Sequence, residues 1–564
     1  MFLATIADRI ENPMTPSAHR DTFARDKLPP RETWPELLFE RPELQYPLRL
    51  NAAAELLDRQ VEFGHGDRPA IWQLVDGKPL FATYAQLQHR VNRIARVLVE
   101  DLGLLPGNRV LLRGPNNPMM AACWLAVVKA GLIAVGTMPL LRARELKQII
   151  DHATPRVALC DAALWQEMAT CTNPNGEHHA ASLERICYFN DGENGSLEDM
   201  LSGKPGDFPA VDTAADDVAL IAFTSGTTGV PKGTLHFHRD VLAMCDCFPQ
   251  SILKVRPNDI FCGTPPLAFT FGLGGMLAFP LRYGASTVLA EKATPETLLK
   301  TIADFRATVC FTAPTFYRQM AGLAARHDLS SLKKCVSAGE ALPDATRQLF
   351  KEATGIELID GIGSTEMIHI FISHTPEAVR RGATGTAIPG YRAQVQDDAG
   401  RVCAPGEVGK LAVKGPTGCR YLADPRQKDY VKNGWNITGD AYSMDADGYF
   451  FYQSRTDDMI ITAGYNVAGP EVESCLLEHP AVAECGVVGA ADAERGQIVK
   501  AYVVLKHDQK GGSAMKKTLQ DYVKSAIAPY KYPRAIEFVA ALPRTETGKL
   551  QRFKLRQAAA TGGK

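Results

Sequence analysis

Apolar residues recur at two spacings between residues 83 and 160, and together these predict a parallel sheet flanked by helices. The capping-box sequence 83–86 is followed by apolar residues at helical spacing, Leu87, Val91, Ile94 and Leu98, which predicts a core-facing helix. We expect the next segments to be a strand (109–112), a helix (118–130), a strand (132–138), a helix (142–152) and a strand (157–160). This alternation is typical of a parallel α/β sheet.

The pattern changes twice in the middle of the chain. Residues 172–216 are rich in glycine, asparagine, aspartate and proline, which predicts loops with a short hairpin before the alternation resumes up to residue 385. Between residues 391 and 414 the apolar runs become shorter and are separated by turn sequences at 397–400 and 405–406. Such spacing favours an antiparallel sheet or a small barrel.

A domain boundary is expected near residues 455–458, so that residues 1–456 form an N-terminal domain and residues 457–564 a C-terminal domain. Beyond the boundary we expect a helix from Glu471, strands (483–488 and 498–505), a helix (515–527) and a strand (536–539). These elements suffice for a separate α+β domain. The glycine-, alanine- and lysine-rich tail after Arg552 is expected to be frayed.

Length and composition exclude several classes of protein. A chain of 564 residues is too long for a single core, and its hydrophobic share of 45% indicates a globular protein. The 62 lysines and arginines are balanced by 63 aspartates and glutamates, which leaves a net charge of −1. The chain therefore has no general electrostatic surface for nucleic acid.

Cysteine usage and the apolar stretches favour a cytoplasmic protein with no membrane partner. The 13 cysteines are scattered and never form paired C-x-x-C motifs, so free thiols in a reducing compartment are expected rather than disulfides or structural zinc. Residues 1–30 lack the apolar region of a secretory signal. The most apolar window, 119–141, is interrupted by Lys129 and Gly131, which favours a helix and a buried strand over a membrane span.

A loop rich in glycine and hydroxyl groups, residues 223–233, follows the apolar run 218–222. Its glycines allow the backbone to approach a ligand closely, its hydroxyls can donate hydrogen bonds, and Lys232 adds a compact positive charge. These properties suit a cradle for a polyphosphate. The loop is not a Walker A motif, because Pro231 precedes the lysine and Gly233 follows it. Taken alone, it could equally be a polar surface turn.

Four later motifs carry residue types that suit a nucleotide. Residues 337–343 form a small-residue turn against which a flat base can lie, although an ordinary tight turn has the same composition. Thr365 and Glu366 place a hydroxyl beside a carboxylate after a glycine-rich strand, which suits a phosphate and its Mg²⁺. Asp440 follows a tight turn and can accept both ribose hydroxyls. Lys549 follows a glycine turn, where a solvated basic tail is the alternative.

Taken together, these motifs resemble the adenylate-forming superfamily of acyl-CoA synthetases, peptide-synthetase adenylation domains and luciferases, over residues 50 to 555. Residues 361–371 resemble aryl-CoA ligases, especially benzoate-CoA and 2-aminobenzoate-CoA ligases, and residues 236–240 and 464–471 favour the latter group. The resemblance implies a large N-terminal domain of doubly wound α/β sheets with a small β-barrel-like subdomain, and a smaller, mobile C-terminal α+β domain.

The resemblance also implies roles for the residues that match the motifs. Catalysis is expected of Lys549, Thr365 and Glu366. The residues expected to bind ATP or AMP are Thr224, Ser225, Gly226, Thr227, Thr228, Gly229, Lys232, Gly339, Glu340, Asp360, Gly361, Thr365, Asp440 and Arg455. The residues expected to enclose the acid are Phe237, His238, Ala338, Gly339, Ile362, Gly363 and Phe269, with Phe269 as an aromatic gate. The remaining roles are Mg²⁺ binding for Glu366 and Thr227, the hinge for Asp457, and CoA binding for Gly464 and Tyr465.

The function implied is an AMP-forming aryl-CoA ligase. Its substrates would be a small aromatic acid, ATP and CoA, and its cofactor Mg²⁺. The resemblance further implies a monomer or homodimer that acts in aromatic degradation. Two alternatives remain: an adenylation enzyme that loads a carrier protein, and a non-enzymatic nucleotide-binding regulator. No downstream carrier domain with a serine attachment site is apparent, and Thr365, Glu366, Asp440 and Lys549 are all present. Ile461 and Gly469 depart from the lysine and proline that many relatives carry, which bears on CoA binding.

Overall fold

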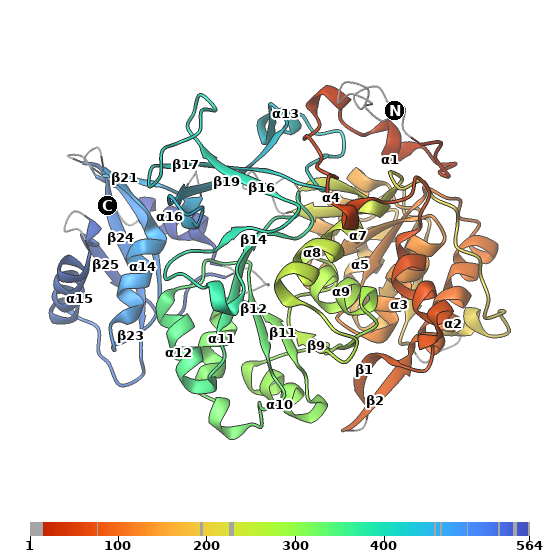
Figure 1. Ribbon diagram of the computed structural model, residues 1–564, viewed down its shortest axis with the longest axis horizontal. Helices are drawn as coiled ribbons and strands as arrows, with labels where there is room; N and C mark the ends of the chain where they lie inside the picture. Colours follow the sequence, from red (N-terminus) through yellow and green to blue (C-terminus); the bar gives the residue numbers. More distant parts are fainter. Residues whose placement is uncertain are drawn as a thin grey trace. The chain divides into compact units, whose positions relative to one another are not determined.

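The computed structural model describes residues 15–75, 77–191, 196–224, 231–455, 458–462, 465–492, 495–527, 531–544 and 550–561 (Figure 1). The chain forms two compact units. The first unit comprises Met1–Lys292, Ser364–His369 and Gly415–Lys428, and the second comprises Ala293–Gly363, Ile370–Lys414 and Asp429–Lys564. Each unit is described by itself below.

A six-stranded sheet forms the centre of the first unit. Its strands lie in the order β6 (Arg185–Phe189), β5 (Val157–Asp161), β3 (Arg109–Arg113), β4 (Ile133–Thr137), β7 (Val218–Thr224) and β8 (Lys232–Phe237). Every pair is parallel except the antiparallel pair of β7 and β8. The alternation of apolar segments therefore predicted this sheet correctly.

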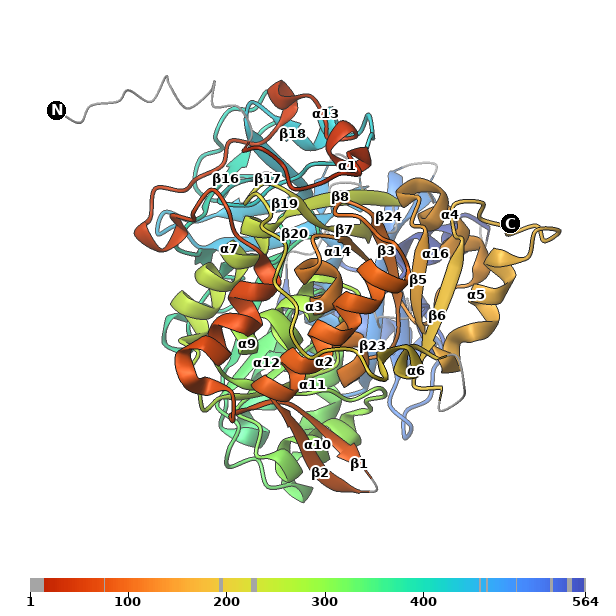
Figure 2. The same ribbon diagram turned by 90° about the vertical axis from the view of Figure 1, so that its right-hand side faces the viewer.

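Helices cover both faces of this sheet. Helix α2 (Tyr84–Arg96) begins at the predicted capping box, in which Thr83 accepts the Gln86 N–H, and α3 (Pro118–Lys129) precedes β4 in the apolar window. Helices α4 (Ala143–Ala153) and α5 (Trp165–Thr172) pack on a core that includes residues of β3, β4 and β5. Figure 2 shows α2 and α3 on the other side of these strands.

The remaining elements of the first unit include four further strands. These lie in the order β9 (Ile260–Gly263), β10 (Ser286–Val288), β1 (Pro69–Val75) and β2 (Lys78–Thr83). The other helices are α1 (Phe23–Asp26), α6 (Leu197–Leu201), α7 (His238–Phe248), α8 (Thr270–Leu273) and α9 (Phe279–Arg282). No described helix combines the length and the apolar character needed to cross a membrane.

The hairpin predicted within residues 172–216 is wrong. Strand β6 from this segment pairs parallel with β5 along its whole length, from Val157 opposite Arg185 to Asp161 opposite Phe189. Its side chains Cys187 and Phe189 are buried, so burial of this short apolar run extends the parallel sheet. The turn-rich composition on either side concealed the strand.

The second unit contains three groups of strands. The first runs in the order β15 (Thr386–Ala387), β14 (Ile370–Ser373), β13 (Leu358–Gly363), β12 (Lys334–Ser337) and β11 (Val309–Thr312). Its helices are α10 (Pro295–Phe305), α11 (Pro314–Ala321) and α12 (Asp344–Thr354). The second group is the antiparallel sheet predicted from residue 391 onward, with β16 (Arg392–Gln396), β17 (Val408–Lys414), β19 (Trp435–Met444), β18 (Val431–Lys432) and β20 (Phe450–Arg455). It is the β half-barrel of the fold.

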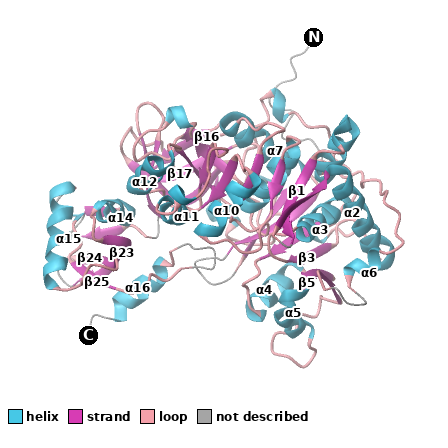
Figure 3. Ribbon diagram, turned by 90° about the horizontal axis from the view of Figure 1, so that it is seen from below, coloured by secondary structure: helices cyan, strands magenta, loops and turns pink. Residues whose placement is uncertain are grey.

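The third group follows residue 460 and matches the predicted α+β order. Its strands are β21 (Ile460–Thr462), β22 (Tyr465–Val467), β23 (Val482–Asp492), β24 (Gly496–Leu505) and β25 (Ala535–Phe538). Its helices are α14 (Gly469–Glu478), α15 (Ser513–Ala526) and α16 (Arg552–Thr561). Helices and strands of this group are coloured by type in Figure 3.

The expectation of a frayed tail after Arg552 is wrong. Helix α16 continues to Thr561, and its residues Leu555 and Ala559 are buried in a small core with Val488 and Tyr502. The two buried residues are four positions apart and so lie on one helix face. This apolar face anchors a segment whose composition alone suggested disorder.

Candidate active site

The two ends of the glycine-rich loop lie side by side at the end of β7 and the start of β8. Antiparallel pairing sets Thr224 opposite Lys232. The Oγ1 atom of Thr224 is buried and has no hydrogen-bond partner in the described part of the chain, an unfavourable state that a bound ligand can relieve. The loop residues predicted to bind ATP, Ser225, Gly226, Thr227, Thr228 and Gly229, lie outside the described residues.

Lys232, Tyr421 and Glu366 form a connected polar group in the first unit. The Lys232 Nζ atom donates to the Tyr421 hydroxyl at 2.9 Å, and that hydroxyl donates to Glu366 Oε1 at 2.5 Å. Lys232 Nζ also lies 3.7 Å from Glu366 Oε1. Two residues singled out by the sequence, a loop lysine and a carboxylate, are thus joined by a tyrosine that the sequence analysis missed.

The turn that carries Thr365 and Glu366 is held by side chains from other segments. His236 Nε2 lies 2.8 Å from the Thr365 carbonyl, and the Thr417 hydroxyl donates to the Met367 carbonyl at 2.8 Å. Ile368 has φ +65°, an unfavourable conformation for a β-branched residue. A strained residue at this point indicates that the surrounding contacts determine the backbone.

Phe237 and His238, which the sequence analysis places at the acid, are both buried in the first unit. Phe237 is fully buried in the hydrophobic core, with the Arg420 guanidinium 4.1 Å from its ring centre. His238 accepts the Ala52 N–H at Nδ1, and burial lowers the pKa of His238 to about 3. Side chains alternate along β8, so His236, not Phe237, shares a face with Lys232. The alternation was readable from the sequence.

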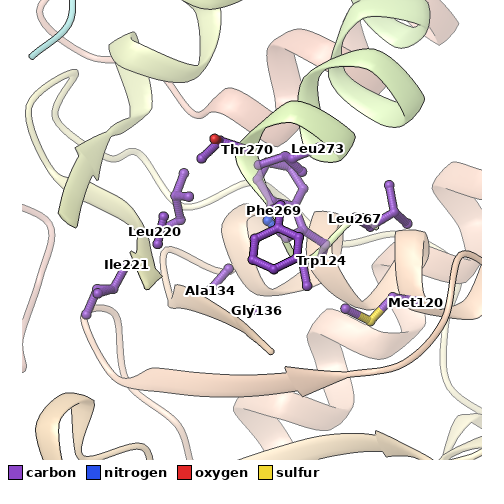
Figure 4. Close-up of a pocket in the computed structure, with 12 residues that line it drawn as sticks. Met120, Trp124, Ala134, Gly136, Leu220, Ile221, Leu267, Phe269, Thr270 and Leu273 are labelled. Carbon is purple, nitrogen blue, oxygen red and sulfur yellow. The ribbon is translucent and has the colours of Figure 1, made fainter. Parts of the chain in front are cut away.

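Phe269 lies in a small apolar cavity of about 10 Å³ that is also lined by Trp124, Leu220 and Leu273. Figure 4 shows its ring among the lining side chains. The volume is enough for roughly one water molecule. The aromatic side chain therefore leaves little free space around it.

His369 stands in an aromatic cluster directly after the turn. Its ring centre lies 5.8 Å from that of Phe248, 5.7 Å from that of Phe271 and 4.5 Å from that of Phe279. Burial lowers the pKa of His369 to about 3, against a small opposing contribution from the Phe271 backbone. Neither ring nitrogen has a hydrogen-bond partner of ordinary geometry among the described residues. A neutral, buried imidazole of this kind is available to a ligand.

Residues predicted to bind ribose pair with each other in the second unit. Asp440 of β19 lies opposite Arg455 of β20, and Arg455 Nη1 is 3.1 Å from Asp440 Oδ1. The Arg455 side chain is 45% exposed, whereas that of Asp440 is 11% exposed. The tight turn predicted before Asp440 is wrong, because Gly439 and Asp440 lie inside strand β19. Gly439 has φ +77° within that strand, a backbone conformation that favours glycine.

Glu340, predicted to lie near adenine, is engaged by two neighbours in the second unit. The Thr315 hydroxyl donates to Glu340 Oε2 at 2.9 Å, and Arg544 Nη1 lies 3.4 Å from Glu340 Oε1. Arg544 also pairs with Glu484 at 2.8 Å. The preceding Gly339 has φ +90°, which presents the glutamate after a left-handed turn.

Asp360 is a buried acid on β13. Burial raises the pKa of Asp360 to about 7, although the Arg347 guanidinium and the Gly361 N–H act in the opposite direction. The Ser373 hydroxyl donates to the Asp360 carbonyl at 2.6 Å. At Gly361 a Cβ atom would lie 2.9 Å from Ile370 Cδ1, so the packing of the Ile370 side chain favours glycine there.

Some of the remaining predicted site residues can be located in the structure, and others lie outside the described residues. In the second unit Ala338 is buried, Ile362 is half-buried and Gly363 is exposed. Tyr465 begins β22. Asp457, Gly464 and Lys549 lie outside the described residues.

The sequence profile of the AMP-binding enzyme family matches residues 57–421, and that of the AMP-binding enzyme C-terminal domain matches residues 471–549. The chain belongs to the AMP-binding enzyme family. The matched ranges include most of the segments that carry the motifs. The fold has the α/β sheets, half-barrel and C-terminal domain of that family.

Comparison with individual AMP-binding enzymes adds detail. The benzoate–CoA ligase of Thauera aromatica is 35% identical over 526 residues, which cover 92% of this chain and 98% of that protein. The solved structure of the anthranilate CoA ligase AuaEII with anthranoyl-AMP has a TM-score of 0.86 and 35% identity, covering 93% of this chain and 99% of that one. The benzoate CoA ligase structure from Burkholderia xenovorans LB400 has a TM-score of 0.81 and 32% identity, covering 90% and 100%.

These similarities make the protein an AMP-forming acid–CoA ligase of the AMP-binding enzyme family. ATP and CoA are the co-substrates of this family. Reaction through an acyl-adenylate follows from the same assignment.

Proposed function

We propose that the protein is an aryl-CoA ligase that activates 2-aminobenzoate or benzoate. The acid's carboxylate oxygen attacks the α-phosphorus of ATP, pyrophosphate leaves, and an aroyl-AMP forms. The CoA thiolate then attacks the acyl carbon and AMP leaves. The relatives named as benzoate–CoA ligase and anthranilate CoA ligase support this choice of acid.

The observation that carries the proposal is the aromatic cluster around His369, three residues after Glu366. Phenylalanine rings suit a flat, neutral aromatic ring. The neutral imidazole, whose nitrogens lack ordinary hydrogen bonds among the described residues, suits an amino substituent on that ring. A dedicated polar partner is what lets a site discriminate strongly between an amino-substituted acid and its plain analogue.

In the first half-reaction we propose that residues of the first unit bind the phosphates of ATP. The buried hydroxyl of Thr224 and the positive charge of Lys232 would contact the phosphates, and Thr365 would contact the α-phosphate. We assign Lys549 to the developing charge on the acid's carboxylate and the α-phosphate, which makes it the catalytic lysine. Preorganised donors of this kind stabilise charge that develops during phosphoryl transfer.

The chemistry of Glu366 suits Mg²⁺. Glu366 is a buried carboxylate at the site, and carboxylate oxygen is a ligand type that Mg²⁺ prefers. We therefore assign Mg²⁺ to Glu366, with Thr227 as a second ligand from the sequence motif. When bound, the ion neutralises charge on the phosphate oxygens.

For the second half-reaction we propose that the C-terminal domain, residues 457–564, rotates about Asp457. The rotation would remove Lys549 and admit CoA, with Phe269 as the gate and Gly464 and Tyr465 as CoA contacts. We assign the ribose to Asp440 and Arg455 and the adenine to the Gly339–Glu340 and Asp360–Gly361 segments. None of the thirteen cysteines, all of which lie in the described part of the chain, forms a disulfide, which fits a reducing compartment such as the cytoplasm.

A panel of acids tests the proposed substrate. We expect 2-aminobenzoate to have the highest kcat/KM, benzoate to follow, and acetate and octanoate to be poor substrates. The measurement is CoA-thioester formation at saturating ATP and CoA. Octanoate turnover equal to or better than that of the aromatic acids would overturn the aryl assignment.

A further inference from the structure

Tyr421 is a buried side chain at the centre of the candidate site, and none of the roles assigned above uses it directly. Its hydroxyl accepts a hydrogen bond from Lys232 Nζ at 2.9 Å and donates one to Glu366 Oε1 at 2.5 Å. Lys232 Nζ also lies 4.9 Å from the Tyr421 ring centre. One hydroxyl group thus joins the lysine proposed for the phosphates to the carboxylate proposed for the metal.

The backbone around Tyr421 fixes this hydroxyl in position. The Leu235 N–H donates to the Arg420 carbonyl and the Leu422 N–H donates to the Gly233 carbonyl, each at 2.8 Å. Thr234 and Tyr421 form an isolated antiparallel bridge. These contacts bind the segment to β8, the strand that begins with Lys232, so Tyr421 and Lys232 keep a fixed separation.

A second set of contacts anchors the same segment. The Arg420 guanidinium is fully buried and pairs with the fully buried Asp240 carboxylate. Burial alone would raise the pKa of Asp240, but Arg420, His236 and Arg239 together outweigh burial and the pKa is lowered. A buried pair with this geometry resists displacement, because either partner left alone would be a buried, uncompensated charge.

The backbone of Glu366 is fixed independently. His236 holds the Thr365 carbonyl, Thr417 holds the Met367 carbonyl, and the Ile368 N–H donates to the Thr365 carbonyl at 3.1 Å. With the backbone of the turn held in this way, the Tyr421 hydroxyl selects the direction of the Glu366 carboxylate. A tyrosine that acted only in packing would not need its hydroxyl aimed at this oxygen.

We propose that Tyr421 is a positioning residue that orients Glu366 toward Mg²⁺. The inference rests on the proposed function, because it takes Glu366 as the metal ligand. The hydroxyl donates to Glu366, which fixes one carboxylate oxygen and leaves the other for the metal. Hydrogen bonds to a metal-binding carboxylate typically contribute 10- to 100-fold to metal affinity or activity.

The test compares Tyr421→Phe with the wild type by calorimetric ATP binding, with and without Mg²⁺. The variant keeps the ring and its contact with Lys232 but loses the hydroxyl. We expect the Mg²⁺ concentration at half-maximal enhancement of ATP binding to rise about tenfold. ATP affinity in EDTA should stay within about twofold, because that affinity does not depend on the direction of the Glu366 carboxylate.

Tyr84→Phe is the matched control. The Tyr84 side chain is also fully buried in the first unit, and its hydroxyl donates to the Ala285 carbonyl at 2.6 Å. This control should leave both ATP affinities at the wild-type level. It therefore reports what loss of one buried tyrosine hydroxyl does to the unit in general.

Three outcomes decide the inference. A rise in the Mg²⁺ requirement confined to Tyr421→Phe supports it. An equal weakening of ATP binding with and without Mg²⁺ overturns it in favour of a purely structural role, and an unchanged Mg²⁺ requirement overturns it outright. Wild-type protein that shows no Mg²⁺-dependent ATP binding would instead contradict the proposed function.

Discussion

The polar cluster around Glu366, made of Lys232, His236, Glu366 and Tyr421, differs from the Asp440–Arg455 pair in how its members are held. His236 and Tyr421 are fully buried, and each makes a hydrogen bond to the turn of Glu366. The Arg455 side chain is 45% exposed. A buried, bonded network fixes geometry, whereas an exposed ion pair is screened by water and contributes little.

Under the proposed function, the buried cluster suits chemistry and the exposed pair suits ligand binding. A fixed carboxylate and lysine are already placed for charge that develops in a transition state. An aspartate whose arginine partner is exposed can exchange that partner for ligand hydroxyl groups at small cost. Variants in the cluster should therefore act on kcat, and variants in the pair on KM.

Glu366→Gln tests the cluster and should have the largest effect. The amide keeps the shape but loses the charge that we assign to the metal, so we expect acid-dependent ATP–pyrophosphate exchange to fall on the order of 10²-fold or more. Glu291→Gln is the control, because Glu291 is also a carboxylate of the first unit and accepts from Asn117. Exchange at the wild-type rate in Glu366→Gln would remove Glu366 from catalysis.

Asp440→Asn tests the pair. Loss of a charged acceptor for the ribose hydroxyls should raise the KM for ATP about tenfold, with kcat changed by less than about threefold. Steady-state kinetics at varied ATP separate the two parameters. If kcat fell as far as in Glu366→Gln with KM unchanged, the distinction between the two regions would be wrong.

His369→Phe tests a third arrangement, a buried polar side chain without an ordinary hydrogen bond among the described residues. We expect the preference for 2-aminobenzoate over benzoate, as a ratio of kcat/KM values, to fall about tenfold. Benzoate turnover serves as the internal control and should change by less than about threefold. An unchanged preference would assign the amino group to another partner.

Asp360→Asn should have the smallest effect and concerns stability. The pKa of Asp360 is about 7 in the folded protein and 3.8 in the unfolded chain. The contribution of Asp360 to the free energy of unfolding is therefore fully present below pH 3.8 and is lost as the pH rises through about 7. The apparent melting temperature of the variant relative to the wild type should therefore rise between about pH 4 and pH 8. A difference that is constant across this range would contradict a buried, protonated Asp360.

Much of the fold could be predicted because local patterns determine it. The Thr83 capping box and the apolar window 119–141 describe short-range preferences, and the structure confirms both. The hairpin in 172–216 and the frayed tail after Arg552 were wrong because long-range burial overrode composition: Phe189 extends a sheet and Leu555 enters a core. Such contacts join segments that no local window compares.

The candidate site could be predicted only where a motif marks it. Lys232 and Glu366 belong to recognisable motifs, and the structure joins them through a third residue. Tyr421 has no local signal, because its role depends on the pairing of its segment with β8. His236 did have a signal, because the two-residue alternation that starts at Lys232 places it on the same strand face as that lysine.

The most direct test of the central claim follows the two half-reactions in one preparation. The protein is mixed with ATP, Mg²⁺ and 2-aminobenzoate without CoA, and pyrophosphate and protein-bound aroyl-AMP are measured before CoA is added. The account predicts about one equivalent of aroyl-AMP per chain, followed by its conversion to aroyl-CoA and AMP on addition of CoA. No acid-dependent pyrophosphate before CoA, or an aroyl-AMP that CoA fails to consume, would contradict it.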